Sequence, residues 1–222
     1  MSYGFQNYYA LLNCGFNLRP SAGNASGVHP VPLGFGRVYV KVDGRFTYEK
    51  FLAGLDAGRS FVTTGPMLMA DMDGRQAGHR FRNVKPGTRF KLKGRLRTDR
   101  PIADSVDIIR NGDIITPMVA QPILNKNGSY EIVINNDIEI ETSSWIAVRY
   151  LERRANDRLR FTHSGIFHFD VPGSKVRPKP QEIAFLIGRM QEQIARSEGV
   201  LPESAIAEYR KALKVYEDIA QP

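Results

Sequence analysis

Four histidines and one cysteine are the side chains of this sequence best suited to bind a metal or to attack a substrate: His29, His79, His163, His168 and Cys14. No His-x-His pair occurs. His163 and His168 are five residues apart, an odd offset that places two side chains on opposite faces of a regular strand, which argues against a shared metal. Because one imidazole cannot define a metal site, His29 is either a metal or substrate contact or an ordinary loop histidine.

Nucleophilic catalysis has little support in the sequence. There is no Gly-x-Ser-x-Gly turn, and nothing positions a base beside Cys14, so we expect a buried thiol there. The glycine-rich segment 21–27 (SAGNASG) could hold a phosphate with backbone N–H groups. It lacks the Lys-Ser/Thr ending of a P-loop and the spacing of a dinucleotide-binding turn, so a loop is the preferred interpretation.

The clearest structural pattern lies in the middle of the chain, at residues 88–98 (TRFKLKGRLRT). Apolar residues and Gly94 alternate with five basic residues, which indicates a strand with one buried and one solvated face. The basic face is either a solvated surface or a contact for an anionic polysaccharide, a phosphate or a partner chain. Because Phe90 alternates onto the apolar face, no exposed aromatic residue is available for base stacking, and sequence-specific nucleic-acid binding is not expected.

Turn signals separate further short strands in the same region. Asn111-Gly112 lies between two apolar runs and predicts a type I′ hairpin, and Asp73-Gly74 and Asn127-Gly128 predict two more turns. Many short strands at close spacing favour an antiparallel β-sandwich of immunoglobulin-like type over residues 67–176.

The two ends of the chain have different patterns. Residues 177–222 predict a helical hairpin in which Pro180 opens the first helix, Gly199 ends it and Pro202 begins the second. Both apolar stripes are expected to serve packing.

Residues 1–66 predict a short helix at about 5–13, a strand at RVYVKV, a helix at YEKFLAGLDAG and a strand at SFVTT. This is the end of an α/β layer, and the overall fold class is α+β. The two strands are expected to lack neighbours, so the chain should self-associate or bind a partner through their edges.

Composition excludes several classes of protein. Of the 222 residues, 42% are hydrophobic and 24% charged, which is typical of a folded chain and not of a disordered one. No apolar run is long enough to span a membrane, and the first residues lack a signal-peptide pattern, so a cytoplasmic location is the default expectation. A formal net charge of +8 permits an anionic partner without identifying one.

The sequence resembles the C-terminal part of the CehA/McbA family, metal-dependent hydrolases of the PHP (polymerase and histidinol phosphatase) superfamily. The resemblance is most specific from Tyr8 to Met67, which carries NYYALLNCGFNLRPSAGNASGV and GFGRVYVKVDGRFTYEKFLAGLDAGRSFVTTGPM in that order. WIAVRYLE and RFTHSGIFHFDV resemble the family more loosely. The resemblance implies that residues 1–66 are the end of a PHP-type α/β barrel, followed by the β-sandwich and the closing helices.

The resemblance also implies a site. Such barrels bind two or three divalent metals (Zn, Mn or Fe), whose bound hydroxide attacks an ester, carbamate or phosphoester. Many relatives carry an Asp and a nearby His after the SAG motif, where this chain has Asn24 and, at a different offset, His29. A neutral amide is a poorer ligand than a carboxylate. The turn after SFVTT suggests substrate contacts from Arg59, Thr63 and Thr64.

Two hypotheses follow. In the first, the chain is the C-terminal half of a CehA/McbA-like hydrolase, inactive and metal-free alone, whose partner is the upstream half of the barrel. In the second, it is a non-catalytic β-sandwich module that binds a glycan, an anionic ligand or a protein.

Overall fold

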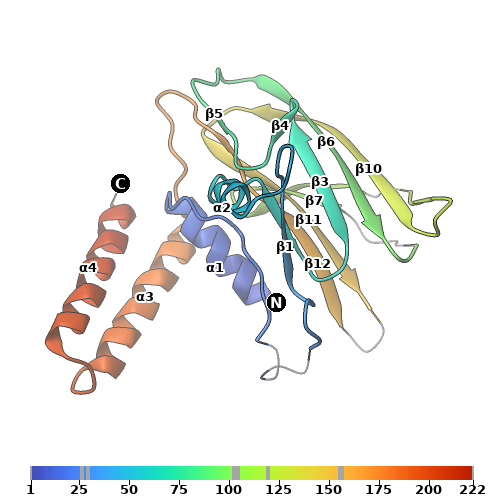
Figure 1. Cartoon of the computed structure of the whole chain (residues 1–222). Helices are drawn as coiled ribbons and strands as arrows, with labels where there is room; N and C mark the ends of the chain where they lie inside the picture. The colour runs from blue at the N-terminus through green and yellow to red at the C-terminus, as the bar shows by residue number, and fades with distance from the viewer. Residues whose placement is uncertain are drawn as a thin grey trace. The chain divides into compact units, whose positions relative to one another are not determined.

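The structure, a computed structural model, describes residues 2–25, 28, 31–101, 106–118, 121–154 and 158–221. It is an α+β chain with mostly antiparallel sheets and two C-terminal helices (Figure 1). Contacts group the chain into two compact units: a helical unit of Met1–Leu18 with Val176–Pro222, and a sheet unit of Arg19–Lys175. The domain boundaries expected at residues 66 and 176 stay a prediction.

The sheet unit contains two sheets. The larger has eight strands: β1 (Arg37–Val40), β2 (Ser60–Thr63), β5 (Arg80–Phe81), β7 (Val106–Arg110), β8 (Asp113–Met118), β11 (Ser144–Arg153), β12 (Leu159–Ser164) and β13 (Phe167–Phe169). The smaller has the order β4 (Arg75–Gln76), β3 (Met67–Met72), β6 (Thr88–Thr98), β10 (Tyr130–Ile140), β9 (Ile123–Leu124). Among these strands only the β13–β5 pair is parallel.

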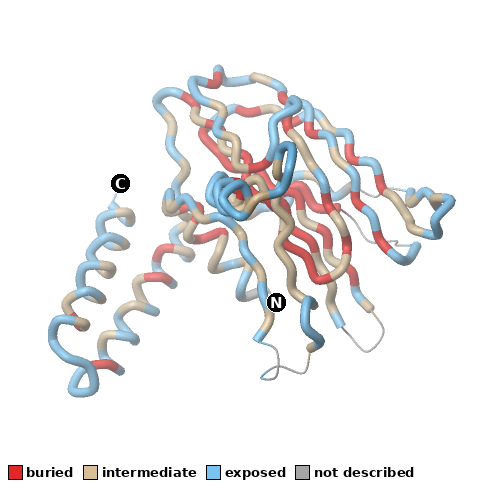
Figure 2. The backbone as a smooth tube through the Cα atoms, in the orientation of Figure 1, coloured by how far each residue is buried: buried red, intermediate tan, exposed pale blue. Residues whose placement is uncertain are grey.

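The core of the sheet unit is built from both sheets. Its fully buried members include Leu92 and Leu96 of β6, Ile108 of β7, and Val148 and Tyr150 of β11. Figure 2 shows the buried positions concentrated along the strands. Since burying one such side chain contributes roughly 1.5–3 kcal/mol, this apolar layer holds the two sheets together.

The alternation expected at residues 88–98 is confirmed. Phe90, Leu92 and Leu96 are buried, whereas the five basic side chains of the strand are exposed. The register of β6 with β10 sets acids against most of these bases, as in the pairs Arg97–Glu131 (2.7 Å) and Arg89–Glu139 (2.8 Å). The basic face is therefore a solvated surface that is largely neutralised within the sheet.

The three predicted turns are present. The one at Asn127-Gly128 joins β9 to β10, with a φ of 80° at Gly128. Asn111 and Gly112 both have positive φ (49° and 90°) between the antiparallel strands β7 and β8, as a type I′ turn requires. Asp73 and Gly74 (48° and 73°) join β3 to β4 in the same way.

The expectation that the strands at RVYVKV and SFVTT lack neighbours is wrong. β1 pairs with β2, and β2 pairs on its other side with β12, about 100 residues later in the chain. Only the outer edge of β1 has no strand beside it among the described residues. The expectation failed because the partner strand, LRFTHS, carries no local signal of what it will pair with.

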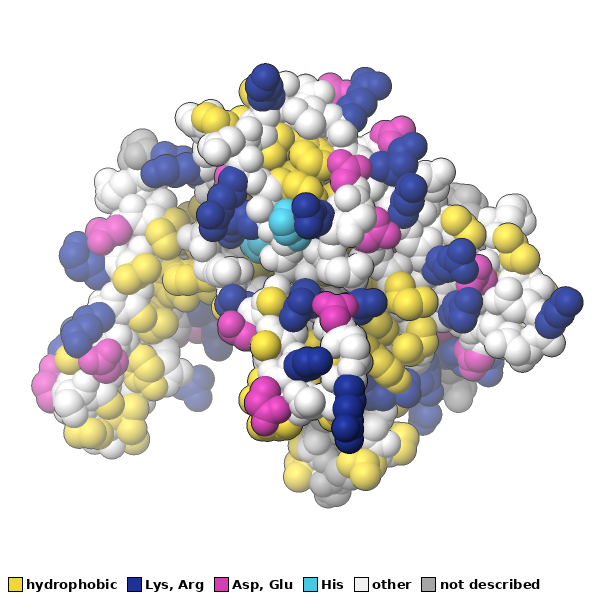
Figure 3. Space-filling model, turned by 45° about the horizontal axis from the view of Figure 1, so that its top comes forward, with side chains coloured by type: hydrophobic (Ala, Val, Ile, Leu, Met, Phe, Trp, Pro, Cys, Tyr) yellow, Lys and Arg dark blue, Asp and Glu magenta, His cyan; other side chains and the backbone are white. Residues whose placement is uncertain are grey.

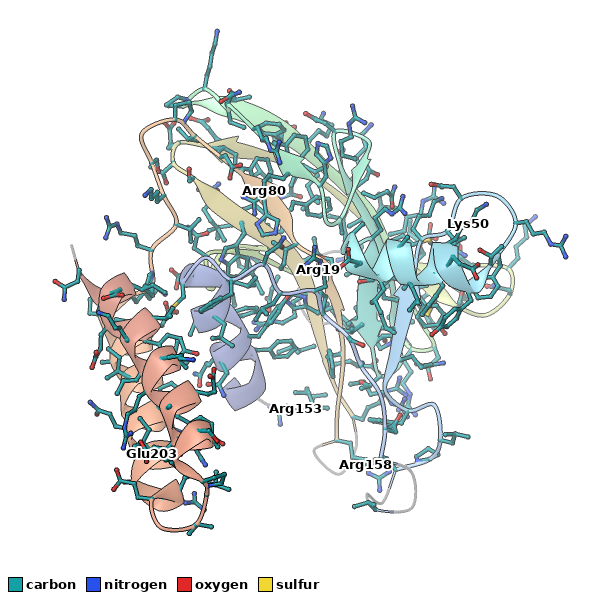
Figure 4. All side chains as sticks on the ribbon, turned by 60° about the vertical axis from the view of Figure 1, so that its left-hand side comes forward. Arg19, Lys50, Arg80, Arg153, Arg158 and Glu203 are labelled. Atoms are coloured by element: carbon teal, nitrogen blue, oxygen red, sulfur yellow. The ribbon has the colours of Figure 1, made fainter. Side chains whose placement is uncertain are left out.

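One helix belongs to the sheet unit. α2 (Tyr48–Asp56) is capped at its N-terminus by Thr47, whose hydroxyl accepts a hydrogen bond from the backbone N–H of Lys50. Gly58, which has a φ of +70°, follows the end of the helix. The side chain of Lys50, labelled in Figure 4, donates to the backbone oxygens of Asp43 and Arg45 and so ties the loop before the helix to its first turn.

The helical unit joins the two ends of the chain. α1 (Ser2–Asn13) contacts α3 (Pro180–Ser197) through Asn13, which donates to a carboxylate oxygen of Glu182 at 3.0 Å. Phe16, just after α1, meets Tyr216 of α4 (Glu203–Ala220) edge to face. The C-terminal helical hairpin is thereby confirmed. No helix in the described residues is long and apolar enough to cross a membrane.

Candidate functional site

A groove of about 900 Å³ opens in the sheet unit. One wall comes from β1 and β2 with the residues that flank them, and the other from β3, β6 and β10. Small residues, Ala70 of β3 and Gly94 of β6, lie side by side in the second wall. Figure 3 shows hydrophobic side chains in this hollow, with Lys and Arg side chains around it.

The β1–β2 wall has an aromatic centre. The rings of Tyr39 and Phe61, which lie opposite each other in the strand register, stack with centroids 5.0 Å apart and planes 8° from parallel. Arg37, two residues before Tyr39 and so on the same face of β1, places its guanidinium 5.9 Å from the centre of the Tyr39 ring. The two rings stack on each other as a compact aromatic pair, and both are half-buried.

Basic residues outnumber acids along the groove: Lys41, Arg59, Lys93 and Arg95, against Asp71. Lys93 and Arg95 belong to the solvated face of β6, and Arg95 lies 3.8 Å from a carboxylate oxygen of Glu131. Arg59 lies 3.7 Å from the exposed carboxylate of Asp43, a contact too exposed and too long to neutralise it fully. The positive charge available to a ligand therefore comes from Lys41 and Arg59.

Two consecutive residues at the start of β2 each have a polar atom without a hydrogen bond among the described residues. The Nε of Arg59 and the Oγ of Ser60 are both buried, and neither has a hydrogen-bond partner in the part of the chain that the structure describes. Both residues line the groove. Buried donors of this kind normally have partners, because leaving one unpaired costs about 1–3 kcal/mol.

The predicted substrate contacts do not gather in one place. Arg59 precedes β2 and Thr64 follows it, so the strand separates them by about 16 Å. The hydroxyl of Thr63 donates to the oxygen of Pro66 (2.6 Å), and that of Thr64 accepts the N–H of Phe161 (2.9 Å). Of the three, only Arg59 lines the groove.

Thr64 belongs instead to a corner at the far end of β2. The guanidinium of Arg160, from β12, donates to the backbone oxygen of Thr64 and lies 5.0 Å from the centre of the Phe35 ring. A Cβ at Gly65 would meet Arg160 at 2.9 Å, so this position accommodates only glycine without a shift. Arg160 thus joins the TTGP turn to the segment after the glycine-rich loop, a link that no local pattern in LRFTHS could have indicated.

Asn24 is part of the same corner. Its side-chain oxygen accepts the backbone N–H of Gly36 at 2.6 Å and closes the base of the loop between them. That oxygen is the atom a metal would need, and it already has a donor. His29, the other candidate ligand, lies outside the described residues.

The remaining histidines are distributed over the sheet. His163 is 1% exposed, and burial lowers its pKa to about 4. His168 lies on a different strand, β13, because the chain turns between the two. Burial, and then Arg80, lower the pKa of His168 to about 4; Arg80 itself pairs with Asp170 at 2.7 Å and is labelled in Figure 4. No cluster of three His, Cys, Asp or Glu residues in the described ranges could bind a metal.

Cys14, the residue after α1, is a free thiol that is half-buried, and not fully buried as the sequence led us to expect. Burial, followed by the nearby charge of Glu182, raises its pKa to about 11. A thiol with a raised pKa carries little thiolate at neutral pH, so its environment does not favour a nucleophile.

Comparisons with known proteins found no similar protein. No protein-family model, curated protein or solved structure matches the chain.

Proposed function

We propose that this chain is the C-terminal part of a CehA/McbA-like hydrolase of the PHP superfamily. On this proposal β1, α2 and β2 are the end of the α/β barrel, and the two sheets form an immunoglobulin-like sandwich behind it. The substrate would be an ester, carbamate or phosphoester, and the partner of the chain would be the upstream part of the barrel.

The corner at Arg160 is the observation that carries the proposal. The resemblance includes two separate motifs, the SAG loop and the FVTTGP turn. Asn24, just after SAG, accepts the N–H of Gly36. Arg160 contacts the neighbouring Phe35 and donates to the oxygen of Thr64 in the turn. Motifs that contribute to the mouth of one site must meet in space, and these do. The open edge of β1 offers a place where a preceding barrel strand could pair.

The described residues do not fit a metal. Asn24 is neutral and its oxygen is engaged by Gly36, and the described ranges hold no cluster of ligands around it. We therefore assign no catalytic step to this chain. The metal ligands and the activation of water belong, on this proposal, to residues upstream of the barrel end.

Sequencing the DNA upstream of the codon for Met1 tests the proposal. We expect a reading frame, joined to this one or beside it, that encodes a His-x-His motif. Co-expression of its product with this chain should give a complex that contains Zn, Mn or Fe by plasma mass spectrometry and hydrolyses 4-nitrophenyl esters or phosphates. An upstream region without His-x-His, or stoichiometric metal and hydrolysis by the chain alone, would contradict it.

A matched pair of variants tests the corner itself. Arg160→Ala removes the link between Phe35 and Thr64 and should weaken co-purification of the two parts at least severalfold. Arg158→Ala removes a neighbouring exposed arginine, labelled in Figure 4, and should leave co-purification unchanged. Equal effects of the two substitutions would show that the corner is not part of the interface.

A second candidate function is a non-catalytic binding module. The groove between β1–β2 and β3–β6–β10 favours it, since its aromatic wall and excess of basic residues suit a ligand and require no metal. A module of this kind would bind its ligand with this chain alone and would have no hydrolase partner upstream.

A further inference from the structure

We propose that the groove between β1–β2 and β3–β6–β10 binds a small organic anion: an apolar body that carries one carboxylate or phosphate. The apolar body would lie against Tyr39 and Phe61, and the oxyanion would bind at Arg59. This inference goes beyond the hydrolase proposal and does not depend on it, because every residue it uses belongs to this chain.

The size and lining of the groove define the body of the ligand. A volume of about 900 Å³ falls in the range of pockets that take drug-sized molecules, roughly 300–1,000 Å³. Tyr39 and Phe61 add two half-buried aromatic side chains to one wall, against which the apolar body of a ligand would lose water. Across the groove, Ala70 and Gly94 leave room that larger side chains would fill.

An unpaired atom defines the charged end. The buried Nε–H of Arg59 is a donor in need of an acceptor, whereas Ser60, the next residue of the extended chain, points to the opposite face. A carboxylate or phosphate oxygen in the groove would satisfy the Arg59 donor. Charge-assisted hydrogen bonds of this kind are about twice as strong as neutral ones, and Lys41 beside Arg59 adds to the positive potential.

The geometry favours a small ligand over a polyanion. The long basic row on β6 that could follow a polymer is paired with acids of β10, as in Arg97–Glu131 and Lys91–Asp137. Arg59, whose contact with Asp43 is long and exposed, instead lines a hollow with largely apolar walls. An anion with an apolar body matches both features, whereas a nucleic acid or an acidic glycan matches only the charge.

Isothermal titration calorimetry with four probes tests the inference: 2-naphthoate, 2-naphthyl phosphate, neutral naphthalene-2-carboxamide, and acetate. We expect saturable binding of naphthoate or naphthyl phosphate at least tenfold tighter than that of the carboxamide and of acetate. Whichever of the two anions binds more tightly shows whether the groove prefers a carboxylate or a phosphate. Equal affinity for naphthoate and the carboxamide, or no saturable binding of either naphthyl anion, would overturn the inference.

Variants separate binding from folding. Arg59→Gln should weaken binding of the preferred anion about tenfold, and Arg45→Gln, the same charge change at an exposed position outside the groove, should not. Ser60→Ala is a second control, because Ser60 points to the face opposite Arg59, and it should leave anion affinity unchanged. Equal losses of affinity in Arg59→Gln and in either control, with thermal stability unchanged, would refute the role of Arg59.

Discussion

A substitution at Gly165 tests the arrangement that positions the start of β2. Gly165 lies between β12 and β13, where its N–H donates to the oxygen of Ser60 at 2.6 Å. A Cβ at this position would lie 2.3 Å from the oxygen of Gly58 and 3.0 Å from that of Ser60, although real contacts of a Cβ stay above 3.0 Å. Since both contacts are with backbone, no side chain can rotate away to relieve them.

The expected cost follows from this overlap. Gly165→Ala must separate two hydrogen-bonded segments by roughly 1 Å or break the Gly165–Ser60 bond, and overpacking of this kind costs about 3 kcal/mol. Urea unfolding followed by the fluorescence of Trp145, the single tryptophan and a buried residue of β11, reports on the sheet unit. With a urea dependence of about 2 kcal/mol per molar, the midpoint should fall by about 1.5 M.

Gly23→Ala is the matched control. A Cβ at Gly23 meets nothing within 4 Å, and the residue belongs to the same unit. Removing glycine from an unstrained position should stabilise by about 0.5 kcal/mol through the unfolded state. If Gly165→Ala changed the free energy of unfolding by less than about 0.5 kcal/mol, the close approach of Gly58 and Gly165 would be refuted.

Two further outcomes are expected. Asp107→Asn breaks a buried ion pair in which the carboxylate accepts two hydrogen bonds from Arg149 (2.7 and 3.1 Å), so the free energy of unfolding should fall by about 3 kcal/mol in urea titrations. Asp137→Asn, in an exposed ion pair, should change that free energy by less than about 0.5 kcal/mol. Equal effects of the two substitutions would contradict the reasoning. Lower pH should also destabilise the fold. The pKa values of His163 and His168 are lowered to about 4, so between about pH 6.5 and pH 4 the unfolded chain binds protons that the folded chain does not. From pH 6.5 to pH 5 each histidine should remove about 2 kcal/mol, and a His168→Asn variant should lose about half as much as the parent; no difference between them would exclude the pKa shift as the cause.

Features that depend on neighbouring residues could be predicted from the sequence. The alternation at residues 88–98 fixed which side chains of β6 are buried, because a strand places successive side chains on opposite faces. Asn111-Gly112 predicted its turn because few other residue pairs tolerate positive φ at two successive positions. Pro180 marked the first residue of α3 for a similarly local reason, its fixed φ and missing N–H.

Features that depend on residues far apart could not be predicted. Nothing in SFVTT indicates that β2 pairs with β12, and without that pairing the link from Arg160 to Thr64 and the contact of Gly58 with Gly165 are invisible. The expectation that β2 would be an unpaired edge failed for this reason. A β-strand presents the same backbone groups to any partner, so the choice of partner depends on the whole core.

The candidate site could be predicted from the sequence only in part. Arg59 was singled out from the sequence and lines the groove, but Ser60 and Tyr39 were not, since a serine and a tyrosine at a strand carry no pattern of their own. Thr63 and Thr64 were grouped with Arg59 because they are close in sequence. The extended strand between them carries that short separation across about 16 Å.

The helical unit is discontinuous in the chain, and this bears on synthesis at the ribosome. Its first segment, with Asn13 and Phe16, emerges before the sheet unit, whereas Glu182 and Tyr216, their contacts, emerge after it. The sheet unit, by contrast, is one continuous segment and can fold as soon as residue 175 has left the exit tunnel. During that interval α1 is without α3 and α4, so this short helix is where a nascent chain of this protein would most need a chaperone.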